Sequence, residues 1–117
     1  MNTRAKGAEY ESRAAEYLEG RGYAILERNC RCGPGEIDLI VEKDGCLVFV
    51  EVKYRKDARW GGAAFAVDAK KQKRLSQAAV FYCVSRKIPP ETPCRFDVVA
   101  VTGDSLTHYE NAFDFRR

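Results

Sequence analysis

The sequence predicts one α/β domain, in which two helices pack against a mixed β-sheet in the order helix, three strands, helix, two strands. The chain has 117 residues, which is enough to build one hydrophobic core. It is 45% hydrophobic and 32% charged, a composition typical of folded globular proteins. Segments with helical periodicity alternate with short apolar runs, which favours helices packed on a sheet. No internal boundary is visible, so residues 1–117 are predicted to form a single domain.

The first helix is predicted over residues 3–20, a segment rich in Ala, Glu and Arg, and Gly20 and Gly22 end it. Residues 23–31 then read as a strand, and residues 32–35 (CGPG) as a turn. The side of the helix expected to face the sheet carries residues at helical spacing: Ala8, Glu11, Ala14, Ala15 and Leu18.

A hairpin is predicted next, with strands over residues 36–42 and 46–55. If Asp44 and Gly45 form a two-residue loop, the numbers of paired residues sum to 89, and Asp38 lies opposite Glu51. A four-residue loop keeps this pairing, whereas a three-residue loop breaks it.

The second half begins with a loop broken by two adjacent glycines, followed by a helix from near Asp68 to about residue 86. Asp68 suits the N-cap position. Residues 88–93 form a linker, residues 95–101 a valine-rich strand, and residues 106–112 a final strand after a turn. The apolar stripe of this helix consists of Leu75, Ala78, Ala79 and Tyr82.

Two carboxylates placed opposite each other in a sheet are unusual. The Cβ atoms of directly opposed residues are about 4.5–5.5 Å apart, so Asp38 and Glu51 would repel each other unless a proton or a cation intervenes. A divalent metal fits between such oxygens. Lys53 lies two residues beyond Glu51 and therefore shares its face.

The two helices add further charges to this region. Glu11 lies in the middle of the first stripe and brings a third acid towards the sheet. Lys71 lies one turn before Leu75, near the second stripe, among the basic neighbours Lys70, Lys73 and Arg74. The formal net charge of +3 and the pI of about 8.6 point weakly to an anionic partner.

Each of these features also has an ordinary explanation. An acid in a strand is usually exposed at an edge or ion-paired, as Glu36 with Lys53 would be, and a basic run on a helix is usually a solvated face. However, three acids and two lysines from four separate elements would all have to be placed inward by chance. The joint arrangement therefore favours a functional site.

The five cysteines are odd in number and match no disulfide framework. Cys30 and Cys32 form a C-x-C without the further ligands that a zinc site needs, so free thiols in a cytosolic protein are expected. There is no apolar signal-peptide centre and no stretch of membrane-spanning length. We therefore expect a cytoplasmic protein without a membrane partner.

Several segments together are similar to a known family. An Asp-containing strand, a hairpin and then E-x-K, here Glu51-Val52-Lys53, resemble the PD-(D/E)XK nuclease superfamily, although Ile37 rather than Pro precedes Asp38. More specifically, "GEIDLI", "LVFVEVKYR", "KKQKRL" and "RFDVVAV" followed by "NAF" resemble the endonuclease-like YraN family from residue 7 to 113. The resemblance implies a restriction-endonuclease-like fold, similar to Holliday-junction resolvases.

The resemblance also implies roles for individual residues. Asp38, Glu51, Glu11 and the Val52 carbonyl would bind Mg²⁺ or Mn²⁺, and the three acids together with Lys53 would be catalytic. The residues expected to contact nucleic acid are Arg55, Lys70, Lys71, Lys73 and Arg74.

The function that follows is metal-dependent hydrolysis of DNA phosphodiesters, structure-selective on branched DNA and carried out by a homodimer. An alternative is a non-catalytic nucleic-acid-binding module that retains the fold. A third reading is a structural partner protein in which the acids form internal ion pairs. Metal binding separates the first reading from the third, and cleavage separates the first from the second.

Overall fold

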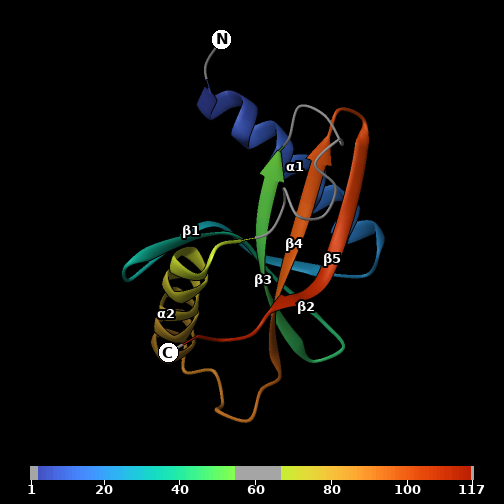
Figure 1. The fold of residues 1–117 in the computed structure, drawn as a ribbon. Coiled ribbons are helices and arrows are strands. Elements are labelled where there is room, and N and C mark those ends of the chain that lie inside the picture. The colour runs from blue at the N-terminus through green and yellow to red at the C-terminus, as the bar shows by residue number, and fades with distance from the viewer. Residues whose placement is uncertain (1–2, 55–66, 117) are drawn as a thin grey trace.

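A five-stranded mixed sheet with two helices forms the fold (Figure 1), and the computed structural model describes residues 3–54 and 67–116. The sheet order follows the chain, with β3 and β4 parallel and every other neighbouring pair antiparallel. This confirms the predicted α/β class and element order. The elements are α1 (Thr3–Gly20), β1 (Ala24–Cys32), β2 (Gly35–Lys43), β3 (Cys46–Tyr54), α2 (Ala69–Ser85), β4 (Cys94–Thr102) and β5 (Ser105–Phe113).

The two helices belong to two separate apolar clusters of the core. The α1 cluster contains Ala14, Ala15 and Leu18, packed with strand residues such as Val48 and Val50. Ala8 was predicted to belong to the same stripe but is exposed, because the first turns of α1 extend beyond the end of β3 (Figure 1). The α2 cluster contains the predicted stripe, with Leu75, Ala78, Ala79 and Tyr82 all buried.

The parallel pair β3 and β4 is the most buried part of the sheet. Residues 47–51 of β3 and 96–101 of β4 are all buried. Strands covered on both faces are normally apolar throughout. The acids within these two runs, Glu51 and Asp97, are therefore costly and require an explanation.

The hairpin between β2 and β3 has the predicted register. The ladder runs from Lys43–Cys46 to Leu39–Val50, and Asp44 and Gly45 both have positive φ, at 53° and 79°. Two consecutive positive φ values are typical of a type I′ turn, which suits the twist of a hairpin. The register thus brings Asp38 next to the end of β3 that carries Glu51.

The remaining boundaries differ from the predictions by one or two residues. The largest change is at the β1–β2 turn, where Cys32 still pairs with Gly35 and only residues 33–34 lie outside the strands. Helix α2 begins as predicted, with the Asp68 side chain accepting a hydrogen bond from the Lys71 amide at 2.8 Å. Neither helix in the described part of the chain is both long and apolar enough to cross a membrane.

Candidate functional site

The structure brings together the three acids singled out in the sequence. Asp38 of β2 and Glu51 of β3 share a hydrogen bond between their carboxyl groups. Glu11 of α1 is hydrogen-bonded to Asp38 and to Asn29 of β1. Three elements that are distant in sequence therefore meet at one carboxyl cluster, which we call the acid site (Glu11, Asp38 and Glu51).

The environment of Asp38 disfavours its negative charge. The Val52 amide donates a hydrogen bond to its Oδ2 at 2.8 Å, in place of a further ladder bond between β2 and β3. Burial, together with the neighbouring Glu51 and Glu11, outweighs that bond and raises the pKa of Asp38 to about 9. The raised pKa favours the protonated form of Asp38, which relieves its repulsion with Glu51.

Glu51 is only 6% exposed, and among the described residues its ion-pair partner is Lys71. The Lys71 Nζ lies 2.9 Å from Glu51 Oε2. Among the residues that the structure describes, this buried oxygen has no hydrogen-bond partner. Although burial acts to lower it, the contact with Glu51 leaves the pKa of Lys71 raised.

Glu11 lies at the edge of the cluster and is half-buried. Burial raises its pKa, the hydrogen bonds with Asn29 and Asp38 oppose the rise, and the charges of Glu36 and Glu51 add to it. The neighbouring acids of the acid site thus contribute to the raised pKa values of both Glu11 and Asp38.

Lys53 and Val52 follow Glu51 directly on β3 and are half-buried. Val52 and Lys53 pair with Val99 and Ala100 of β4, so the strand is regular here and Lys53 shares the face of Glu51, as predicted. The Val52 amide is used by Asp38, as described above.

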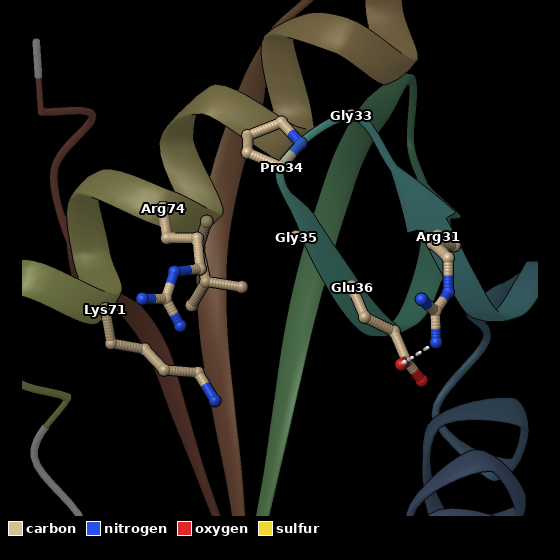
Figure 2. A pocket seen from close by; sticks show the side chains of 8 residues that line it. Arg31, Gly33, Pro34, Gly35, Glu36, Lys71 and Arg74 are labelled. Carbon is tan, nitrogen blue, oxygen red and sulfur yellow. Dashed lines mark ion pairs between the residues drawn. The ribbon is translucent and has the colours of Figure 1, made fainter.

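The predicted nucleic-acid-binding residues separate into two groups. Lys71 and Arg74 line a cavity between α2 and the β1–β2 turn, which Figure 2 shows. Lys70 and Lys73 are exposed on the same helix and do not line that cavity. Arg55 lies outside the described residues.

The oxygen ligands available at the acid site favour one class of metal ion. Within residues 3–54 and 67–116, no group of three or more His, Cys, Asp or Glu is arranged to hold a metal ion. The close pair Asp38 and Glu51 remains, with a buried oxygen that lacks a hydrogen bond. Two carboxylates fit a hard cation such as Mg²⁺ or Mn²⁺, which keeps several waters and binds the rest of its shell through substrate phosphate.

A second buried carboxylate was missed in the sequence. Asp97 of β4 is fully buried and accepts hydrogen bonds from Arg95, from His108 Nε2 at 2.7 Å and from the Asn111 amide at 2.9 Å. Arg95 also donates to the Tyr23 hydroxyl at 2.7 Å. An Asp inside the valine-rich segment 95–101 and the single histidine of the chain were the available signals.

Comparison with known proteins finds relatives that match most of the chain. Residues 10–101 match the model of the uncharacterised protein family UPF0102. A UPF0102 protein of Lachnoclostridium phytofermentans is 44% identical over 114 residues, covering 97% of both chains. One of Acidovorax sp. is 47% identical over 116 residues, covering 96% of this chain and 86% of its own length.

A third relative, the UPF0102 protein PC1_0307 of Pectobacterium carotovorum, is 45% identical over 97% of both chains. The chain therefore belongs to the YraN-like protein family UPF0102.

Proposed function

We propose that this protein is a metal-dependent nuclease that hydrolyses phosphodiester bonds in DNA. The observation that carries the proposal is the pair Asp38–Glu51, a half-buried and a buried carboxyl group held together, with one Glu51 oxygen that has no hydrogen-bond partner among the described residues. Strongly perturbed pKa values in such clusters are typical of functional sites. The α-β-β-β-α-β-β order and the sequence E-V-K at residues 51–53 further support a PD-(D/E)XK-type nuclease.

Asp38 and Glu51 would hold Mg²⁺ or Mn²⁺, with Glu11 and the Val52 carbonyl as the further ligands that the family resemblance implies. A bound divalent cation polarises a phosphoryl oxygen and lowers the pKa of a coordinated water. In the hydrolysis, a water oxygen forms a bond to phosphorus, the bond to the leaving sugar oxygen breaks, and the leaving oxygen takes up a proton.

The lysines complete the chemistry from the same side of β3. Lys53 would orient the attacking water or stabilise the negative charge that develops on the phosphoryl oxygens. Lys71, which neutralises Glu51 in this structure, would hold a substrate phosphate. Phosphate contacts carry no base information, so recognition would depend on DNA structure rather than sequence. A homodimer acting on branched DNA in the cytoplasm is the form that we propose.

The test is a cleavage assay on linear duplex, single strands and four-way junctions with Mn²⁺ or Mg²⁺, comparing the wild type with Glu51→Gln. We expect junction-selective cutting by the wild type only. Glu51→Gln should bind DNA at least as tightly in the absence of metal, because it removes a charge that repels phosphate. Equal cutting by both proteins would contradict the assignment of Glu51.

The second candidate is a nucleic-acid-binding module without catalysis. The ion pair between Lys71 and Glu51 favours it, because a cation already compensates one of the two carboxylates. Binding without cutting in every metal tried would support this module. If the wild type binds no nucleic acid at low salt, both candidates fail and the acids have a structural role.

A further inference from the structure

A cavity of about 310 Å³ lies between helix α2 and the turn that joins β1 and β2. Figure 2 shows Lys71 and Arg74 reaching into it from α2 and Arg31 approaching from the opposite side. Three cations therefore converge on one hollow, and Glu36 is the single acid among the described residues that line it.

Two of these cations have little compensation. The Arg31 side chain is 87% exposed, and its nearest acid oxygen, on Glu36, lies at 4.0 Å, the outer limit of an ion pair. Such a pair is worth little in solvent. No ion pair to Arg74 is found among the described residues. Two guanidinium groups without strong partners suit the geometry of a phosphate group.

The backbone of the β1–β2 turn forms the floor of the cavity. Gly33 has a φ of +55°, which a residue with a side chain rarely adopts. A Cβ atom at Gly35 would lie 3.2 Å from Arg74 Cγ, closer than ordinary contact. The glycine at residue 35 therefore allows the stem of Arg74 to lie directly against the start of β2.

The cavity is linked to the acid site through a shared residue. Lys71 lines the cavity and also pairs with Glu51. Arg31 and Glu36 line a second hollow, of about 560 Å³, together with Glu11. The Arg31–Glu36 pair thus lies between two hollows, and each hollow contains a residue that touches the acid site.

The geometry points to a phosphate-binding subsite formed by Arg31 and Arg74, which holds a backbone phosphate of a nucleic acid next to the phosphate at the acid site. This inference rests on the proposed function and extends it, because Arg31 and the Gly33–Gly35 turn were not among the predicted contacts. Arg31 and Arg74 are positioning residues. A nucleic-acid strand that follows both hollows passes over the acid site.

The test measures binding of a labelled DNA junction and duplex in EDTA, where no metal-dependent cutting occurs. Arg31→Ala and Arg74→Ala are compared with Arg21→Ala and Arg28→Ala, which remove the same charge from exposed residues that line neither hollow. Each arginine variant should bind about tenfold more weakly. Each should also lower the slope of log K against log salt by roughly 0.7–0.9. The Arg21 and Arg28 control variants should change affinity less than threefold at about 0.15 M salt, because distant charges are screened.

Two further variants distinguish a built subsite from general charge. Arg74→Lys keeps the charge but not the planar fork, so it should restore only part of the affinity. Gly35→Ala should weaken binding through the displacement of Arg74 while leaving Arg31 in place. Amide NMR spectra report whether each variant is folded and whether inorganic phosphate shifts the signals of Gly33 and Gly35.

The possible outcomes distinguish failure of this inference from failure of the proposed function. If the wild type binds DNA and all four alanine variants weaken it equally, the subsite is overturned and the nuclease proposal stands. If only inorganic phosphate binds, and it depends on Arg31 and Arg74, the cavity is a free-anion site and the nucleic-acid assignment is overturned. If neither binds, both proposals fail.

Discussion

Two carboxyl groups of this sheet, the fully buried Asp97 and the half-buried Asp38, have opposite environments. Asp97 accepts two hydrogen bonds from Arg95, one from His108 and one from the Asn111 amide. Burial acts to raise the pKa of Asp97, but these donors together bring it below its usual value. Within the described part of the chain, Asp38 has one amide donor and two neighbouring acids, and its pKa rises to about 9.

The difference shows that burial alone does not identify a functional acid. Both carboxylates cost free energy when they leave water. At Asp97 the fold offsets that cost with donors from β4 and β5, as expected for a structural group. At Asp38 and Glu51 the cost is left partly uncompensated. A carboxyl cluster with perturbed pKa values, retained at the expense of stability, is typical of a site that binds a cation or a substrate.

The largest expected effect is the loss of stability when Asp97 is replaced. Asp97→Ala leaves the Arg95 guanidinium and His108 without their buried partner and should lower the free energy of unfolding by about 3–5 kcal/mol. Urea denaturation of the wild type and the variant measures this difference in the free energy of unfolding. Glu110→Ala is the matched control, since Glu110 is an exposed partner of the same arginine at 3.7 Å. Similar losses in both variants would contradict a special role for Asp97.

The second largest expected effect is the stabilisation by a divalent metal, which should depend on Asp38 and not on Asp97. Mn²⁺ at a hundredfold excess over its dissociation constant stabilises a protein that binds it by about 2.7 kcal/mol. We expect Mn²⁺ to raise the melting temperature of the wild type, and Asp38→Asn to abolish that rise. The response should be accompanied by proton release, because Asp38 must lose its proton to bind metal. An unchanged response in Asp38→Asn would exclude this carboxylate as a ligand.

The pH dependence of stability should have opposite signs at the two acids. The folded-state pKa of Asp38 is raised, so its contribution is fully present below about pH 4 and is lost as the pH rises towards about 9. The folded-state pKa of Asp97 is lowered, so its contribution is present above about pH 4 and is lost at more acidic pH.

Asp38→Asn should therefore be more stable than the wild type by about 1–3 kcal/mol at pH 8, with the gain shrinking towards pH 4. Denaturation at a series of pH values, without divalent metal, measures the difference. A gain that is independent of pH would show that repulsion with Glu51 is not its cause.

The smallest effect belongs to the exposed partner of the Asp97 network. Glu110 is 64% exposed, accepts a hydrogen bond from the Tyr23 hydroxyl at 3.3 Å, and lies near Arg95. Glu110→Gln should change the free energy of unfolding by less than about 1 kcal/mol, and salt should reduce the difference further. A larger loss would mean that the network depends on its exposed edge, which would weaken the contrast with the acid site.

Local patterns in the sequence determined most of the fold. The Asp44-Gly45 turn set the hairpin register, which brought Asp38 and Glu51 together as predicted. Asp68 and the stripe from Leu75 to Tyr82 defined α2, and the position of Glu11 on its helix placed it at the acid site. These features follow from the fixed periods of helix and strand, which depend only on neighbouring residues.

The partners of each charge were decided only by the tertiary structure. A bulge between Phe96 and Val98 shifts the β4–β5 register, and Asp97 meets His108 and the Asn111 amide there, which the strand patterns do not show. Likewise, Lys71 reaches Glu51, and Arg31 approaches Arg74 across a glycine turn, because α2 packs beside β2. Such contacts depend on how elements distant in sequence approach one another, and no local period contains that information.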